Sequence, residues 1–197
     1  MKLPNIIAFH GTFDTAAKKI VGNRMYEIGD IRENHWLGQG VYFYREDMES
    51  AKLWAMNKVS NVEELGNDDA VVLYSEIKAN YYRFLNLDTR EGMLRFEKYL
   101  QKIEDKINEF GISLEGKPDL LRCLMMDTIP KSEVDLIQRT FKVPSKYDQL
   151  QLINDADLHL HGIQLCVRKP EIIIKDSINI IKIIPVAQLR RKKRTSR

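Results

Sequence analysis

The segment HWLGQGVYFY, residues 35–44, predicts a tight turn that leads into a buried strand. Gly38 and Gly40 allow the bent or left-handed backbone that such a turn needs. From Val41 to Tyr44 the residues are β-branched or aromatic, which favours a strand. Because neighbouring strand residues point to opposite faces, the rings can fill a core on one face and stack on a flat ligand on the other. A core strand without a ligand would produce the same pattern.

The chain before this segment predicts a strand and a short helix. Leu3 to Phe9 is apolar and leads to His10-Gly11-Thr12, which we interpret as a strand that runs into a turn. Asp14 or Thr15 can then cap a helix that Gly22-Asn23 ends. His10 is therefore expected at a strand end, where reactive groups are often placed, although a hydrogen-bonded structural histidine is the commoner occupant of such a position.

The middle of the chain alternates between helix and strand patterns. A helix is predicted from Glu46-Asp47 to about Val59, followed by strands over 70–79 and 82–87. Apolar residues at intervals of three and four then predict helices over 91–110, after Pro118, and through Val134, Ile137 and Phe141. The faces of all three helices are typical of a protein core.

The last third of the chain returns to strands, predicted at 162–167, 172–174 and 178–184. The sequence therefore predicts a single α+β domain over residues 1–189, in which strands from the two ends of the chain pair with each other. The helical segment, at about 89–145, is an insertion or a side wall of this domain. Residues 190–197 are a basic tail.

Composition limits the classes of protein to consider. The chain has 197 residues, of which 44% are hydrophobic and 30% charged, enough for one well-cored domain. Cys123 and Cys166 lack metal-ligand spacing, and the four histidines are scattered, so no metal site is predicted. No segment approaches transmembrane length, and the apolar residues 6–9 are too few for a signal-peptide core. We expect a reduced, cytoplasmic protein without a membrane partner.

The net charge of +3 comes from the tail. Six of the 31 basic residues lie in the last eight positions, and the remainder of the chain has 25 basic against 28 acidic residues. Such a tail can bind a phosphate backbone through counterion release, or it can be a solvated end.

Three short motifs resemble those of the ADP-ribosyltransferases of the poly(ADP-ribose) polymerase type, the H-Y-E class. That family has a strand-ending H-G-S/T, a G-x-G-I/V-Y-F/L strand and an S-x-S-A helix. The matching residues are His10-Gly11-Thr12, Gly38 to Phe43, and Ser50-Ala51, with matching internal spacings over residues 9–55. The resemblance implies the split β core of this family, and the helical middle lies outside it.

The resemblance also implies a role for each matching residue toward the co-substrate NAD. His10 would hydrogen-bond a hydroxyl of the adenine-side ribose, and the backbone of Gly11, next to Thr12, would hold the nicotinamide carboxamide. Tyr42 would stack on the nicotinamide ring, and Ser50 would hydrogen-bond its carboxamide. The residue types suit these tasks, because glycine allows close backbone approach and tyrosine offers a flat ring. An exposed helix serine is the alternative explanation of Ser50.

The chain departs from the family pattern at two positions. Leu53 stands where a second stacking tyrosine is usual, and Trp54 follows it as the alternative wall of the nicotinamide site. The family's catalytic glutamate begins a late strand, and the best match here is Gln164, a register that Ile173 supports. A glutamine stabilises the cationic sugar of the transition state far less than a carboxylate, and it cannot act as a base. It can still orient the ribose 2′-hydroxyl.

The exchange at Gln164 favours transfer of one ADP-ribose unit over chain elongation, with the base supplied elsewhere. Candidate bases are Glu46, Asp47, Asp155, Asp157 and Glu171, with no ground to choose among them. The polar segment 147–161, which the resemblance places near the acceptor, offers His159 and His161 as further candidates, on one face of a predicted strand.

The resemblance therefore implies mono-ADP-ribosyl transfer from NAD to a macromolecule, protein or nucleic acid, as in a bacterial or phage-borne effector or toxin. The catalytic set would be Gln164, Tyr42 and His10. One alternative is a catalytically silent module that binds NAD or ADP-ribose. Another is a nucleic-acid-binding protein that uses its basic tail.

Overall fold

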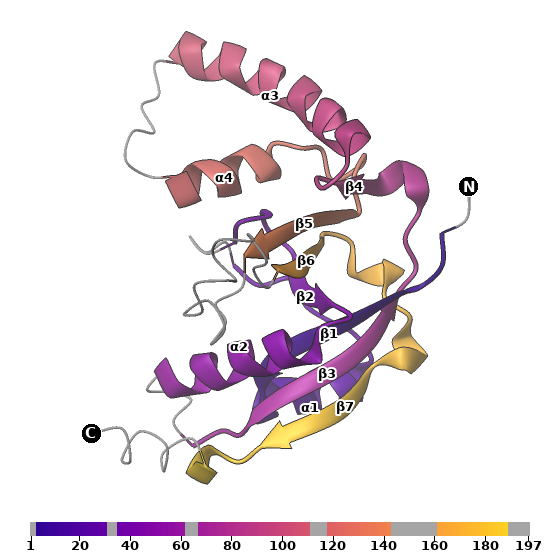
Figure 1. Ribbon diagram of the computed structural model, residues 1–197, viewed down its shortest axis with the longest axis vertical. Helices are drawn as coiled ribbons and strands as arrows, with labels where there is room; N and C mark the ends of the chain where they lie inside the picture. The colour runs from indigo at the N-terminus through magenta and orange to yellow at the C-terminus, as the bar shows by residue number, and fades with distance from the viewer. Residues whose placement is uncertain (1–2, 31–34, 62–66, 111–117, 143–160, 189–197) are drawn as a thin grey trace, which may run out of the picture.

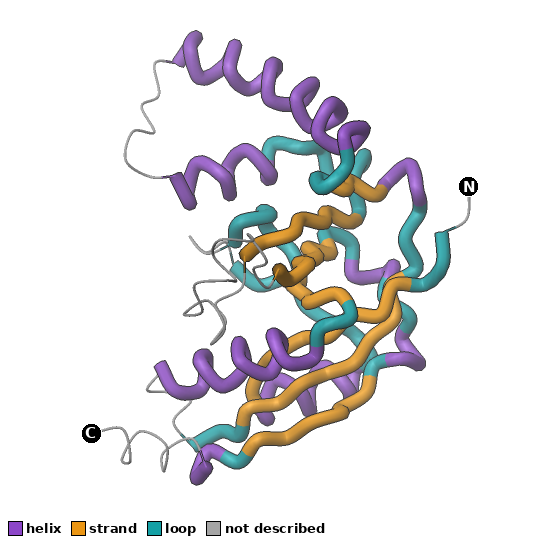
Figure 2. Tube along the Cα trace, viewed as in Figure 1, coloured by secondary structure: helices purple, strands orange, loops and turns teal. Residues whose placement is uncertain are grey.

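A computed structural model describes residues 3–30, 35–61, 67–110, 118–142 and 161–188 of the chain. The fold is α+β, as predicted: a seven-stranded mixed sheet has the order β4-β5-β6-β2-β1-β3-β7, with helices on both faces (Figures 1 and 2). Neighbouring strands are antiparallel except for β4 and β5. The strands are β1 Ile6–Phe13, β2 Val41–Arg45, β3 Ala70–Ile77, β4 Phe84–Asn86, β5 Leu136–Lys142, β6 His161–Val167 and β7 Asn179–Ile184.

Four α-helices lie among the described residues: α1 Asp14–Asn23, α2 Met48–Asn61, α3 Arg90–Phe110 and α4 Pro118–Asp127. Short 3₁₀ turns occupy Tyr81–Arg83, Pro170–Ile172 and Lys175–Ser177. Within the described parts of the chain, no helix has the length and apolar character needed to cross a bilayer.

Strands from the two ends of the chain pair with each other, as the sequence predicts. β2 pairs with β6 from Val41–Val167 to Tyr44–Gln164, and β3 pairs with β7 from Ala70 onward. β6, β2 and β1 are therefore consecutive neighbours at the centre of the sheet. These are the strands that carry Gln164, Tyr42 and His10.

The two faces of the sheet carry separate cores. On one face, β1 and β3 pack against Ala17 of α1, in a cluster that includes Phe43 and Leu165. On the other face, α2 covers β1 and β3, while α3 and α4 cover β5 and β6 (Figure 1). The two clusters of this second face meet at β2, because Tyr42 packs against the α3–α4 cluster and Tyr44 against the α2 cluster.

The predicted third helix is wrong, because residues 136–142 form strand β5. Ile137 and Phe141 are four residues apart, and that spacing puts two side chains on one face of a strand as well as of a helix. Leu136 and Ile137 are both buried, on opposite faces of the sheet, as suits a strand between two neighbours. The described helices of the insertion thus lie between Arg90 and Asp127.

Two further predictions need correction. His10 does not lie at a strand end, because β1 continues to Phe13 and pairs with β3 along its whole length. Residues 172–174 are not a strand, because Pro170 begins a 3₁₀ turn and only Ile173 bridges to Ile77.

Candidate functional site

The candidate site lies where β1 and β2 stop pairing. These strands share only the pairs Ala8–Arg45 and Phe9–Tyr44, after which their ladder opens. At the opening the imidazole Nδ1 of His10 lies 2.7 Å from the backbone carbonyl oxygen of Tyr42. A carbonyl oxygen can only accept, so Nδ1 carries the proton and Nε2 is left as an acceptor.

The imidazole of His10 is neutral at physiological pH. Its ring packs against Tyr26 and Phe43, with centroid distances of 5.4 and 5.5 Å. Burial lowers the pKa of His10 to about 4, against the smaller opposing effect of the bond to Tyr42 and with a small contribution from the charge of Lys58. A neutral ring with Nε2 unprotonated can accept a hydrogen bond from a ligand hydroxyl.

Tyr42 is fixed at both its hydroxyl and its ring. The hydroxyl donates to the carbonyl of Gly38 and accepts from the N–H of Leu37, both at 2.8 Å. Burial of this group raises the pKa of Tyr42. The imidazole of His35 stacks on the ring, with centroids 5.1 Å apart and planes at 27°. His35 thus lies directly against the ring that the motif resemblance predicts to stack on nicotinamide.

Gln164 shares a face of the sheet with Tyr42. It lies opposite Tyr44 on β2 and opposite Arg139 on β5, while Tyr42 lies opposite Cys166. Tyr42 and Gln164 are therefore diagonal neighbours across the β2–β6 pair, at about 7–8 Å between Cβ atoms in standard geometry. The side chain of Gln164 is half-buried, and its amide makes no hydrogen bond to the described parts of the chain.

Helix α2 approaches this face at Gly11. A Cβ at Gly11 would lie 2.1 Å from the carbonyl oxygen of Ala51, so only glycine fits. The next residue of the motif, Thr12, is 2% exposed and by strand alternation lies with His10 on the α1 face. The structure therefore brings Gly11, Tyr42 and Gln164 to the α2 face, while the side chains of His10 and Thr12 start from the opposite face.

Ser50 and Trp54 lie on the flank of α2 that faces β2. The opposite flank, with Lys52 and Met56, lines a hollow against β7. Ser50 is buried, and its backbone N–H donates to the Asp47 carboxylate, which caps the helix, at 2.9 Å. Its hydroxyl has no hydrogen-bond partner among the described residues. Trp54 is 44% exposed, one helical turn beyond Ser50, whereas Leu53 projects away from the sheet. Trp54 is thus the better placed of the two to line a ligand site.

Sequence reasoning missed three residues around this site. His35 lies in the segment 35–44, but its stacking on Tyr42 has no signature in the sequence. Asp127, at the end of α4, accepts a hydrogen bond from the N–H of Gln39 at 2.7 Å. Arg139 lies beside Gln164 on a segment predicted to be a helix.

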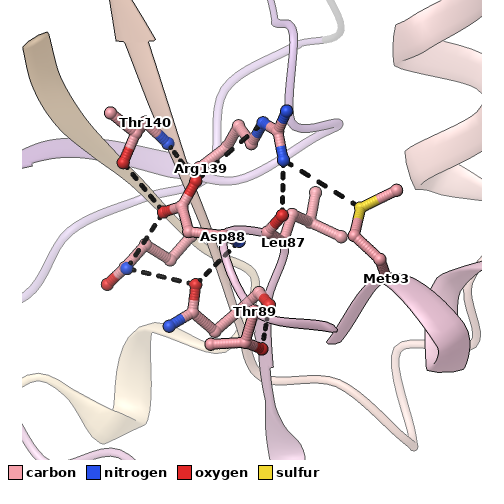
Figure 3. A network of polar contacts seen from close by, with 8 residues as sticks. Leu87, Asp88, Thr89, Met93, Arg139 and Thr140 are labelled. Atoms are coloured by element: carbon pink, nitrogen blue, oxygen red, sulfur yellow. Dashed lines mark hydrogen bonds and ion pairs between the residues drawn. The ribbon is translucent and has the colours of Figure 1, made fainter. Parts of the chain in front are cut away.

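Arg139 belongs to a network that joins the end of β4 to β5 (Figure 3). Its guanidinium donates to the carbonyl of Leu87 and lies 3.9 Å from the carboxylate of Asp88. Asp88 also accepts from the N–H and the hydroxyl of Thr140, both at 2.9 Å. This network holds β5, and with it the Arg139–Gln164 pair, in register.

The candidate bases are only partly described. Most of the segment 147–161 lies outside the described residues, and with it the candidates Asp155, Asp157 and His159. The basic tail, 190–197, also lies outside them. His161 is exposed at the start of β6, three residues before Gln164, which puts the two side chains on opposite faces of the strand. Asp47 caps α2, and Glu46 has a left-handed backbone with φ of 56°. Glu171 lies in the exposed 3₁₀ turn after β6.

No family model matches this chain, and no solved structure matches it. The chain is 24% identical over 191 residues to an uncharacterized protein of Methanocaldococcus jannaschii. That match covers 89% of this chain and 87% of the other. The two proteins are therefore similar in length. The relative is itself uncharacterized, so the match does not indicate a function.

Proposed function

We propose that this protein transfers a single ADP-ribose unit from NAD to a macromolecular acceptor. One observation carries the proposal: three adjoining strands place Gly11, Tyr42 and Gln164 on the α2 face of the sheet, with His10 at the opening between β1 and β2. These are the residues that the sequence motifs match to the ADP-ribosyltransferases of the poly(ADP-ribose) polymerase type. The strand pairing was not used in choosing them, so their convergence is an independent argument.

The co-substrate would bind along the α2 face. Its nicotinamide ring would stack on Tyr42, and its carboxamide would meet the backbone of Gly11 and the hydroxyl of Ser50. Nε2 of His10 would accept a hydrogen bond from a ribose hydroxyl at the opening. Trp54 would close the exposed side of the site.

His35 must leave its place for nicotinamide to stack on the same ring face. A ring stacked between His35 and Tyr42 would need a centroid separation of about 4.5–7 Å from each of them. The two centroids are only 5.1 Å apart, so no ring fits between them. Binding of NAD on that face of the Tyr42 ring would therefore displace His35.

The reaction breaks the bond between nicotinamide and the ribose C1′, and nicotinamide leaves with the electron pair. An acceptor heteroatom then bonds to C1′ and gives its proton to a base. Gln164 would hold the ribose 2′-hydroxyl by its side-chain amide, but it supplies no negative charge to the developing sugar cation. This arrangement favours slow, single transfer rather than polymer growth on a sugar hydroxyl.

A catalytically silent NAD-binding module is the second candidate, and Gln164 is the observation that favours it. The third, a nucleic-acid-binding protein, depends on the tail 190–197, which lies outside the described residues.

The test is NAD binding by calorimetry together with nicotinamide release. We expect Tyr42→Ala to weaken binding by about 1–3 kcal/mol, the scale of a lost aromatic platform, and His10→Ala to weaken it as well. Tyr82→Ala is the matched control, because Tyr82 is 69% exposed and precedes β4 at the sheet edge. Binding without nicotinamide release would select the silent module. If both site variants bind NAD like the parent, the site is refuted.

A further inference from the structure

The side chain of Tyr42 holds the turn before β2, residues 37–40, by hydrogen bonds. Gly38 has a φ of +81°, and its N–H donates to the carbonyl of His35 at 2.9 Å. The Tyr42 hydroxyl then bonds both Gly38 and Leu37, as described above. The position of the Tyr42 ring and the position of the turn are therefore set together.

Asp127 clamps the same turn from the outside. Its Oδ1 accepts the N–H of Gln39 at 2.7 Å, and a Cβ at Gly38 would lie 2.6 Å from that oxygen. The same Cβ would lie 3.0 Å from the Cβ of Met126, so the end of α4 is packed directly on the turn. No other side-chain acceptor is recorded for the N–H of Gln39 within the described parts of the chain.

The end of α4 is itself anchored to the sheet. Arg168, which follows β6 and is 4% exposed, donates from Nη2 to the carbonyl of Ile129 at 2.8 Å. The Sγ of Cys123 lies 3.6 Å from Oδ2 of Asp127, one helical turn away, and donates to it. The carboxylate of Asp127 is thus presented to the turn from a fixed support.

We propose that Asp127 is a positioning residue for the nicotinamide site, acting through the turn 37–40 on the ring of Tyr42. The inference rests on the proposed function, and it gives the helical insertion a role that the motif resemblance does not cover. α4 would complete the site by fixing the turn, since the carboxylate bridges a covering helix to the strand that carries the stacking ring. Its contact is with the protein backbone rather than with the substrate.

Variants at Asp127 separate hydrogen bonding from charge. Asp127→Ala removes the acceptor, and we expect NAD affinity to fall by about tenfold, the equivalent of 1.4 kcal/mol, with KM affected more than kcat. Asp127→Asn keeps an oxygen acceptor and should stay within about twofold of the parent. Asp127→Glu keeps the charge but moves the carboxylate, and should resemble the alanine variant. Thr128→Ala is the control, because among the described residues its hydroxyl donates only to the carbonyl of Met125, at the same helix end.

A second measurement does not need NAD. Stacking on Tyr42 shifts the imidazole proton resonances of His35 upfield, and we expect Asp127→Ala and Tyr42→Phe to reduce that shift, but not Asp127→Asn. In the Tyr42→Phe background, Asp127→Ala should have less effect than in the parent, because the hydroxyl link between turn and ring is already broken.

Each outcome decides the proposal. It is overturned if Asp127→Ala leaves both NAD affinity and the His35 resonances at their parental values, or if Asp127→Asn is as impaired as Asp127→Ala. Equal losses in Thr128→Ala would also overturn it, as general weakening of α4. If Asp127→Ala does not fold, the asparagine and Tyr42→Phe variants decide. If the parent binds no NAD, the proposed function fails, and the His35 resonances alone test the positioning.

Discussion

The Nδ1 atom of His10 hydrogen-bonds the backbone carbonyl of Tyr42 at 2.7 Å, at the first position where β1 and β2 no longer pair. The His10 side chain thus donates to a carbonyl oxygen that would otherwise accept a backbone N–H from the neighbouring strand. The bond keeps β1 and β2 joined while leaving room between their backbones. It also fixes the imidazole tautomer, which directs Nε2 away from Tyr42 as an acceptor.

The lowered pKa of His10 predicts a pH-dependent stability. Burial lowers this pKa from 6.5 to about 4, so the unfolded chain binds a proton that the folded chain does not in this window. The free energy of unfolding should therefore be unaffected by His10 above pH 6.5 and fall as the pH drops from 6.5 towards 4. The full loss is roughly 3 kcal/mol.

Urea denaturation at pH 7 and at pH 4.5 measures this loss. His10→Asn is the matched variant, because its amide nitrogen lies two bonds from Cβ, as Nδ1 does, and can still donate to the Tyr42 carbonyl without titrating. Its stability should change less between the two pH values than that of the parent. An identical pH dependence in the two proteins would contradict the assignment of a neutral His10 in the folded chain.

Substitution of Gly11 by alanine should cause a steric clash that the same substitution at Gly22 should not. We expect Gly11→Ala to destabilise the fold by about 1–3 kcal/mol, because its Cβ would meet the backbone of α2, which can only move as a unit. The control is Gly22→Ala in α1, where a Cβ meets nothing within 4 Å and alanine should stabilise the helix by up to about 1 kcal/mol. Thermal unfolding of both variants compares them, and equal effects would argue against the close approach of α2.

The elements with strong local patterns were predictable from the sequence. The β-branched and aromatic run of β2 and the long amphipathic repeat of α3 both appear where expected. β5 was misassigned, because a four-residue apolar spacing suits either period and only its two neighbouring strands decide between them. The strand end at His10 was misplaced because Gly11 was interpreted as a turn residue, whereas it marks close packing against α2.

The candidate site was predictable only as a list of residues. The sequence pointed to His10, Gly11, Tyr42 and Gln164, but which face each side chain occupies depends on strand register. Asp127 and Gln39 are 88 positions apart, and their hydrogen bond forms only once α4 has packed on the sheet. No local pattern reports a contact of that kind.

Gln164 decides between an enzyme and a silent module, because the motif resemblance matches it to the family's catalytic glutamate. It lies beside Tyr44 and Arg139. If it orients the 2′-hydroxyl, Gln164→Ala should lower transfer strongly with little change in NAD affinity, since the interaction would matter mainly in the transition state. Gln164→Glu should restore or raise nicotinamide release, because a carboxylate would face the developing sugar cation. If the protein is a silent module, the parent should show no turnover. Any activity would then appear in the Gln164→Glu variant alone. Calorimetry and nicotinamide release measure both quantities. Full parental transfer by Gln164→Ala would refute this register, and Glu171, in the 3₁₀ turn after β6, would then be the carboxylate to test.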